Sequence, residues 1–279
     1  MTIMSFGKSL GFLLAQTYIV MIRIDLKQQE HNTNIGDICG HINPNITEDS
    51  IFYADDNPVG FYIKRLSKYS EKASKLASLA NKELRSKNVP KSVMKRSSGF
   101  SNPENEVLQY STIIGSVPPK PHMRRPYPTI SSVHNVSSAK TFIKAMLMLC
   151  KESEELVKKI TPNIFNNQIK LIEENVPKQW RFGRMFTSSI SNYNIPAPFH
   201  RDNANIKGCV NVIIAKKNNA TGGNTTVPDY NATVDSSDDS MLVYPAWRNV
   251  HGVTPIVPTA PDGYRNSLVF YPLKAFKGL

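Results

Sequence analysis

Two residues in the last third of the chain have the types and spacing of metal ligands. His200 and Asp202 are separated by a single residue in the segment HRD. On a β-strand, residues i and i+2 point to the same face, so both side chains would point inward together. A histidine and a carboxylate beside open coordination positions are typical of the non-haem Fe(II) oxygenases. The spacing therefore predicts two of the three ligands of an iron site.

A third ligand and a partner for an anion follow further along the chain. His251 lies in NVHGVTP, after another pair of predicted strands, and Arg265 and Ser267 lie in RNSLVFY. A buried arginine binds a carboxylate through two parallel hydrogen bonds, as a dicarboxylate cosubstrate requires. One more strand can bring the arginine and the serine to the same inward face. The order HxD, distant histidine, then Arg-x-Ser is the layout of the 2-oxoglutarate-dependent oxygenases, in which the motif lies on a double-stranded β-helix.

Two other catalytic classes also use these residue types. Protein kinases carry HRD with an asparagine five residues after the aspartate. That position is Lys207 here, and the chain has neither a glycine-rich loop nor a DFG motif, which excludes a kinase. A Ser/His/Asp hydrolase is poorly supported because the sequence contains no G-x-S-x-G.

The spacing of apolar residues predicts the helices and strands around these candidate ligands. From Trp180 onward, short β-rich runs alternate with turns, which favours a sandwich or small barrel. Apolar residues at spacings of three and four predict helices over 66–84, 138–160 and 164–175. Two β-rich runs flanking a DDNP turn predict a hairpin within 51–66. The predicted fold class is α+β, with a double-stranded β-helix core of the jelly-roll, cupin-like type and helical N-terminal elements.

The chain divides by composition into two parts. Residues 1–137 are expected to form a basic N-terminal region that packs on or extends the core. Residues 138–279 are expected to form the oxygenase core, with its catalytic part in 180–279, and the two parts to make one structural unit. Residues 97–137 are rich in Ser, Pro, Asn and Gly, so we expect a loop or a partly extended segment there.

Positive charge is concentrated in one segment. The formal net charge is +12, and the segment Lys64–Arg96 holds eleven Lys and Arg against two Glu. A solvated lysine face is the ordinary explanation, but such a concentration also fits contact with the phosphates of a nucleic acid. The candidate contacts to the DNA backbone are Lys64, Arg65, Lys68, Lys72, Lys75, Arg124 and Arg125.

No segment of the sequence indicates export or a membrane. The longest charge-free apolar run is shorter than a membrane span, and the three cysteines are widely spaced with no CxxC. A disulfide framework and a zinc finger are therefore excluded, and an intracellular location, cytoplasmic or nuclear, is expected without a membrane partner.

Two segments resemble the TET/JBP family, the DNA 5-methylpyrimidine dioxygenases. The stretch PAPFHRDNANIKG, over 196–208, is similar to the metal-binding strand of the TET enzymes. The stretch HGVTP from His251 and the stretch RNSLVFYPLK from Arg265 resemble the C-terminal strands of those enzymes. Together the two matching segments, 196–208 and 250–279, cover 43 residues. The chain lacks the cysteine-rich region of the animal enzymes and resembles a compact, minimal member.

The resemblance implies a cofactor and two cosubstrates. His200, Asp202 and His251 would hold Fe(II). Arg265 would bind the distal carboxylate of 2-oxoglutarate with help from Ser267, and O2 would be the second cosubstrate.

The resemblance also implies how a base is bound. Asn205 occupies the place of an asparagine that hydrogen-bonds the flipped base, and Tyr271 occupies the place of an aromatic ring that stacks on it. The family's histidine two residues later is Leu273 here. The implied function is hydroxylation of 5-methylcytosine to 5-hydroxymethylcytosine in double-stranded DNA, with further oxidation open. Leu273 leaves room for thymine hydroxylation of the JBP kind. An oxygenase acting on RNA or protein, and a non-catalytic basic DNA-binding module, also stay open.

Overall fold

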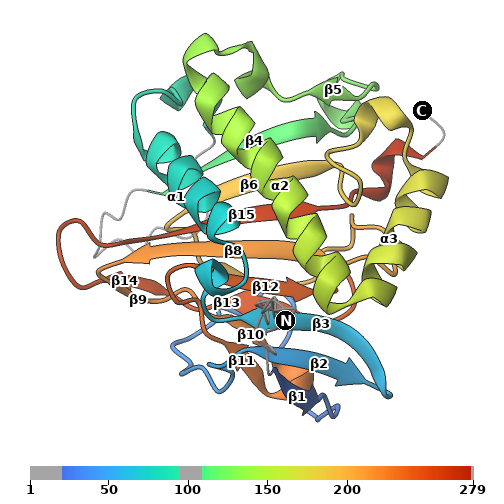
Figure 1. Ribbon diagram of the computed structural model, residues 1–279, viewed down its shortest axis with the longest axis vertical. Coiled ribbons are helices and arrows are strands. Elements are labelled where there is room, and N and C mark those ends of the chain that lie inside the picture. Colours follow the sequence, from blue (N-terminus) through green and yellow to red (C-terminus); the bar gives the residue numbers. More distant parts are fainter. Residues whose placement is uncertain (1–20, 95–108, 278–279) are drawn as a thin grey trace, which may run out of the picture.

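Two β-sheets and a layer of helices make up the described part of the chain, residues 21–94 and 109–277, in the computed structural model (Figure 1). The large sheet has nine strands, in the order β1 (Ile22–Asp25), β2 (Ser50–Ala54), β3 (Asn57–Ile63), β12 (Ser240–Tyr244), β8 (Asn211–Asn218), β15 (Tyr264–Tyr271), β6 (Ser188–Tyr193), β4 (Tyr110–Val117) and β5 (Thr129–Ile130). The small sheet has the order β11 (Ala232–Val234), β10 (Thr225–Val227), β13 (His251–Val253) and β7 (Ala197–His200). A separate pair joins β14 (Ile256–Pro258) and β9 (Ala220–Gly222).

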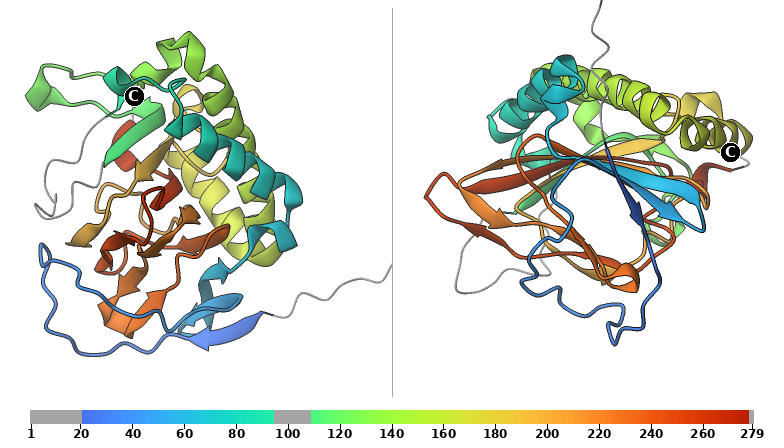
Figure 2. Two further views of the ribbon diagram at one scale, coloured as in Figure 1. Left: turned by 90° about the vertical axis from the view of Figure 1, so that its left-hand side faces the viewer. Right: turned by 60° about the horizontal axis from the view of Figure 1, so that its bottom comes forward.

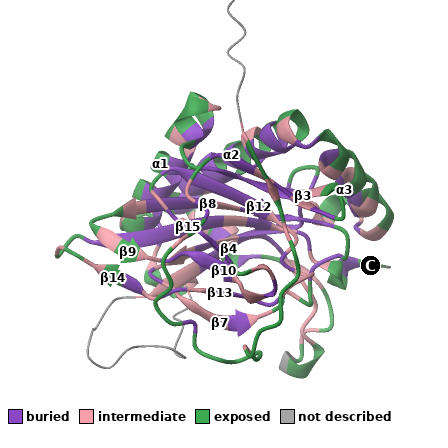
Figure 3. Cartoon of the chain, turned by 90° about the horizontal axis from the view of Figure 1, so that it is seen from below, coloured by how far each residue is buried: buried purple, intermediate pink, exposed green. Residues whose placement is uncertain are grey.

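The helices cover one face of the large sheet, and the small sheet lies on the other side (Figures 2 and 3). They are α1 (Glu71–Arg85), α2 (Lys140–Ile160) and α3 (Pro162–Asn175). This arrangement agrees with the predicted α+β class and its double-stranded β-helix core. None of the helices in the described ranges is long and apolar enough to cross a membrane.

The alternation of side chains along β15 separates the two faces of the large sheet. Leu268 and Phe270 are fully buried in the apolar cluster beneath the helices. Arg265, Ser267 and Tyr271 line a cavity on the opposite face. The period of two along a strand explains the division, and the sequence predicted it. One strand thus contributes both to the core and to the cavity.

Helix α1 packs on the sheet through a stripe of small residues. Ala73, Ala77, Ala80 and Leu84 are all fully buried. The helix begins later than the apolar spacing predicts, because Ser70 caps it by accepting a hydrogen bond from the backbone N–H of Ala73 at 3.1 Å. The residues from 66 to 69 form a 3₁₀ turn and its end instead.

The expectation of a loop over 97–137 is wrong for part of that range. Strand β4 occupies Tyr110–Val117 and pairs with β6, so it lies inside the large sheet rather than outside it. The segment YSTIIGSV is itself rich in residues that favour strands. The residues on either side of this segment are rich in proline and serine, and they determined the overall composition of 97–137 that predicted a loop. Residues 97–108 of the expected loop lie outside the described residues.

The N-terminal part is built into the same sheet as the catalytic part. The predicted hairpin is confirmed as β2 and β3, and its turn residues Asp55 and Asp56 both have positive φ, at 50° and 58°. Strand β3 pairs with β12, which comes some 180 residues later. The three cysteines are buried and free.

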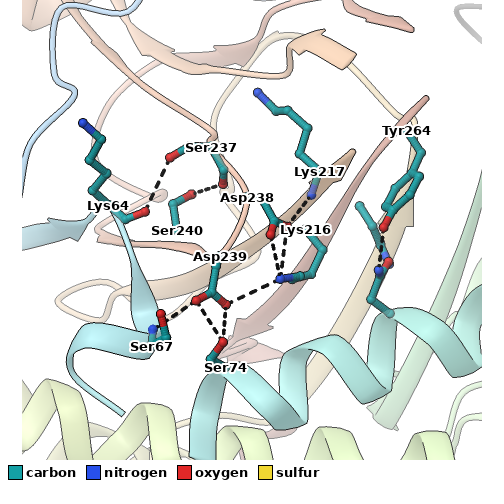
Figure 4. Close-up of polar contacts among 12 residues, drawn as sticks. Lys64, Ser67, Ser74, Lys216, Lys217, Ser237, Asp238, Asp239, Ser240 and Tyr264 are labelled. Carbon is teal, nitrogen blue, oxygen red and sulfur yellow. Dashed lines mark hydrogen bonds and ion pairs between the residues drawn. The ribbon is translucent and has the colours of Figure 1, made fainter. Parts of the chain in front are cut away.

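A buried polar cluster ties α1 to the sheet (Figure 4). The Asp239 carboxylate accepts hydrogen bonds from the Ser67 N–H at 3.0 Å and from the Ser74 hydroxyl at 2.8 Å. The ammonium of Lys216 lies 3.5 Å from the same carboxylate and 3.0 Å from that of Asp238. Asp239 and Lys216 are both buried, whereas the side chain of Asp238 is 51% exposed.

Replacing Asp239 by alanine should lower the free energy of unfolding by about 3 kcal/mol, because it leaves buried donors and a buried cation without their main acceptor. Asp238→Ala is the matched control and should cost about 1 kcal/mol or less, because that carboxylate is half exposed. Urea denaturation of both variants checks this. Equal losses would show that the buried cluster does not hold α1 in place.

Candidate active site

Two strands of the small sheet bring three potential metal ligands together. His200 ends β7 and pairs directly with His251, the first residue of β13, and their rings are 4.3 Å apart. Asp202 lies just beyond the end of β7 rather than on it. Its side chain still lies beside His200, as predicted, but the chain brings it there after the strand has ended. Ligand atoms of all three side chains lie within 4.8 Å of one another. This group can hold a metal ion.

Hydrogen bonds to backbone carbonyls orient both imidazoles. His200 Nδ1 lies 2.7 Å from the Pro198 carbonyl oxygen, and His251 Nδ1 lies 3.1 Å from that of Asn249. A carbonyl oxygen only accepts, so Nδ1 is the protonated nitrogen in each ring. Nε2 therefore carries the free lone pair, as a metal ligand requires.

The Asp202 carboxylate is held by two asparagines. Its Oδ2 accepts hydrogen bonds from the side-chain amides of Asn211 at 2.9 Å and Asn205 at 3.5 Å. Its Oδ1 faces His200 Nε2 at 3.6 Å. One carboxylate oxygen is thus fixed by the protein, while the other points to the ligand group.

Burial keeps His251 neutral. Its side chain is almost fully buried, and this burial is the main reason that its pKa falls from 6.5 to about 4. The nearby His200 lowers the pKa further, as a second and smaller cause. A neutral imidazole is the form that binds metals. At neutral pH the ring is therefore ready to coordinate without losing a proton first.

A cavity of about 500 Å³ joins this group to the predicted anion partner. Arg265 lines the cavity, is 3% exposed, and donates from Nε to the Ser236 hydroxyl at 3.0 Å. Burial lowers the pKa of its guanidinium to about 10, so it stays charged at neutral pH. Within the described ranges no carboxylate pairs with it. A buried guanidinium without an ion-pair partner destabilises the protein unless an anion binds to it. The site therefore fits a ligand with a carboxylate.

Close packing fixes the guanidinium in place. Gly223 has φ of +73°, and a Cβ at this position would lie 3.1 Å from three side-chain atoms of Arg265. A larger residue there would push the arginine aside.

The predicted contacts to the cosubstrate and to the base, Ser267, Asn205 and Tyr271, also line the cavity. Ser267 accepts a hydrogen bond from the Asn192 amide at 3.4 Å, and Tyr271 and Leu273 lie further along the same wall. Asn205 is buried and donates to the Asn211 side-chain oxygen at 2.8 Å. Its amide nitrogen is thus engaged, and its amide oxygen is what it can offer to a ligand.

Asn192, Asn211 and Tyr244 line the cavity and were not predicted from the sequence. Tyr244 packs edge-on against His251, with ring centroids 5.3 Å apart, and burial raises its pKa, so its hydroxyl stays protonated. Each has the inward parity of its strand, and Asn211 interrupts an otherwise apolar run. A polar side chain at an inward position was the signal available in the sequence.

The basic residues of α1 and the turn before it do not reach this cavity. The apolar stripe of α1 packs on the far face of the large sheet, which fixes its charged face on the helical side (Figures 1 and 2). Arg65 is exposed on that side. The four lysines predicted to contact DNA form ion pairs, which are Lys64–Glu48, Lys68–Asp49, Lys72–Glu152 and Lys75–Glu71.

The two predicted arginines lie in the connection between β4 and β5. Arg125 donates to the Thr129 hydroxyl at 2.8 Å and to the Pro118 carbonyl, which fixes the turn. Arg124 is exposed and has a left-handed backbone conformation. Only Arg124 of this pair projects freely toward solvent. Residues 95 and 96 of the basic segment lie outside the described residues.

The metal-free protein should lose stability as the pH falls from about 6.5 to about 4. The folded protein resists protonation of buried His251 until about pH 4, whereas the unfolded chain takes up that proton near 6.5. The stability present above pH 6.5 is therefore lost over this window, by up to about 3 kcal/mol. Urea denaturation across this range checks it, with His251→Gln as the control that lacks this part of the slope. An identical slope in both proteins would contradict the assignment.

Comparison with known proteins agrees with this geometry. The family model of the TET/JBP oxygenase domain of the 2OGFeDO superfamily matches residues 119–274, more than half of the chain. No curated protein matches the chain.

The fold is similar to solved structures. NgTET1 in complex with 5mC DNA is 15% identical, with a TM-score of 0.55 over 88% of this chain and 84% of that chain. A 2OG-Fe(II) oxygenase family protein from Burkholderia pseudomallei is 14% identical, with a TM-score of 0.40 over 74% of this chain and 81% of that one. The family match covers more than half of the chain and includes all three residues of the His–Asp–His group. The chain therefore belongs to the TET/JBP family and is a dioxygenase that uses Fe(II) and 2-oxoglutarate.

Proposed function

We propose that this dioxygenase hydroxylates the 5-methyl group of 5-methylcytosine in DNA. The observation that carries the proposal is that one cavity is lined by the His–Asp–His group, by the unpaired Arg265 and by the predicted base contacts Asn205 and Tyr271. The family match supports a 5-methylpyrimidine as the substrate class. The product would be 5-hydroxymethylcytosine, and further rounds would give the formyl and carboxyl bases.

The protein residues have separate tasks in this reaction. His200 and His251 would bind Fe(II) through Nε2, and Asp202 through Oδ1. Arg265 would hold the distal carboxylate of 2-oxoglutarate, which places the keto-acid end toward the ligand group. Bound iron with 2-oxoglutarate supplies the activation of O2, coupled to oxidative decarboxylation of the cosubstrate.

The base must leave the duplex to enter the cavity. Flipping it out costs a few kcal/mol. Stacking on an aromatic ring such as Tyr271 returns about 1–3 kcal/mol of this. The Asn205 amide oxygen can accept a hydrogen bond from the exocyclic amine of cytosine or from the ring N–H of thymine.

One observation favours thymine as a second candidate. Leu273 lines the cavity and pairs in an isolated bridge with Asn205, close to where the base would lie. Its side chain offers no hydrogen bond to distinguish the polar edge of cytosine. Hydroxylation of thymine in DNA therefore stands as the alternative.

Exposed cations at the cavity rim are suited to the phosphates beside a flipped base. Arg201 lines the cavity and is exposed. Lys274 is exposed, and its backbone N–H donates to the carbonyl of Ala204, another cavity residue, at 3.0 Å. Within the described part of the chain neither forms an ion pair, in contrast to Lys72 and Lys75 of α1.

Incubation with Fe(II), 2-oxoglutarate and a duplex containing 5-methylcytosine should yield 5-hydroxymethylcytosine by nucleoside mass spectrometry. Asp202→Ala should abolish turnover and leave DNA binding intact, because phosphate contacts dominate affinity. A duplex with thymine as its only 5-methylpyrimidine is the matched substrate. Hydroxymethyluracil alone would move the assignment to thymine. Succinate formation without either product would remove DNA as the substrate.

Reversing the rim charges with Arg201→Glu and Lys274→Glu should weaken DNA binding and reduce the salt slope by about two units. Lys72→Glu with Lys75→Glu reverses the same number of charges on α1 and should leave the slope nearly unchanged. Fluorescence anisotropy at several salt concentrations measures both. A larger effect from the α1 pair would instead restore the contacts expected from the sequence.

A further inference from the structure

A segment between β1 and β2, residues 26–49, wraps around the small sheet, and we call it the strap (Figure 2, blue). At one edge of the sheet, the Gly36 N–H donates to the Phe199 carbonyl at 2.8 Å, and the Phe199 N–H donates to the Asp37 carbonyl at 2.9 Å. At the other edge, the Ile46 N–H donates to the Thr233 carbonyl at 3.0 Å. The strap therefore closes both edges of the sheet that carries the two histidines.

A chain of hydrogen bonds runs from the strap to His251. The His31 ring reaches one oxygen of Asp229 at 2.6 Å, and the Asn249 amide donates to the other at 2.5 Å. The Asn249 carbonyl in turn accepts from His251 Nδ1 at 3.1 Å. Three bonds thus connect a residue of the strap with a predicted metal ligand 220 residues later in the chain.

The proton positions in this chain follow from its partners. His31 Nδ1 accepts a hydrogen bond from the Thr33 N–H at 3.2 Å, so the proton is on Nε2, which donates to Asp229. Asp229 is buried, and although burial raises its pKa, the bonds from Asn249 and His31 hold it below the ordinary value. The carboxylate is therefore charged and accepts from both sides. Each link has a donor facing an acceptor.

Asp229 anchors the loop that presents Asn249. It accepts from the Asn249 side chain, and its own carbonyl accepts from the Gln29 N–H of the strap at 2.7 Å. Asp229 is thus bonded through its side chain to Asn249 and through its backbone to the strap. These bonds help to fix the loop from which the Asn249 carbonyl orients the imidazole.

We propose that Asp229 and His31 are positioning residues for His251, and that the strap is therefore part of the metal site. Neither residue touches the metal. They hold the Asn249 side chain, and the backbone carbonyl of the same residue fixes the ring plane and the tautomer of His251. Groups that hydrogen-bond a ligating histidine directly typically contribute 10–100-fold to metal affinity or activity. Asp229 and His31 act on that partner, Asn249, from further out.

The proposal changes which part of the chain makes a complete site. The family model matches residues 119–274 and so leaves the strap outside. Asp229 lies inside the match, but its partner His31 does not. A metal site with full affinity would then need the N-terminal segment as well as the matched oxygenase domain.

Titration of the full-length, metal-free protein with Co(II), followed by visible absorption, tests the proposal. Asp229→Ala should weaken binding about 10-fold, at the lower end of the range for direct partners because it acts through Asn249, and should alter the shape of the Co(II) bands. His31→Leu should weaken it to a smaller extent, and His31→Gln should restore most of the loss, because its amide can donate to Asp229.

Asp49→Ala is the matched control. Asp49 is a buried carboxylate of the strap that accepts from the Lys64 N–H at 2.8 Å and the Tyr69 hydroxyl at 2.8 Å, but it faces the helical side. It should lower stability and leave Co(II) affinity unchanged. Wild-type affinity in Asp229→Ala, or an equal loss in Asp49→Ala, would overturn the proposal. The readout depends on the metal site alone, so failure to oxidise 5-methylcytosine would leave it standing.

Discussion

The guanidinium of Arg265 is a buried positive charge that no carboxylate of the described chain neutralises. Such a charge is tolerated only if an anionic ligand pairs with it or surrounding polar groups solvate it. The fold keeps a cavity open between its two sheets, and Arg265 and the His–Asp–His group both line it. A molecule with a carboxylate at one end and a metal-chelating group at the other satisfies both requirements at once.

The two sheets make this arrangement rigid. Strand β15 places Arg265 and Ser267 on the cavity face and Leu268 and Phe270 under the helices, so the site cannot shift without disturbing the core. Backbone carbonyls and asparagine amides orient each ligand before any metal binds. Preorganised ligands need little rearrangement, which raises affinity for the metal.

Much of the site could be predicted because its signals are local in sequence. HxD and Arg-x-Ser are short motifs, and the parity of a strand assigns their faces without a structure. Strand β4 was missed because loop-forming residues surround it. The bonds between His31 and Asp229 join residues 198 positions apart, and no local pattern indicates such a contact. The ion pairs of Lys64, Lys68 and Lys72 could not be predicted, because their acidic partners Glu48, Asp49 and Glu152 lie elsewhere in the chain.

The central claim is that one cavity binds both ends of 2-oxoglutarate, one on Fe(II) and the other on Arg265. The most direct test is an anaerobic titration of the Fe(II) protein, followed by the visible absorption of the Fe(II)–keto-acid chelate. The account predicts that 2-oxoglutarate binds roughly 100-fold or more tightly than 2-oxobutyrate, which lacks the distal carboxylate. It also predicts that Arg265→Met removes this preference. Equal affinity for the two keto acids in the unmodified protein would contradict the account.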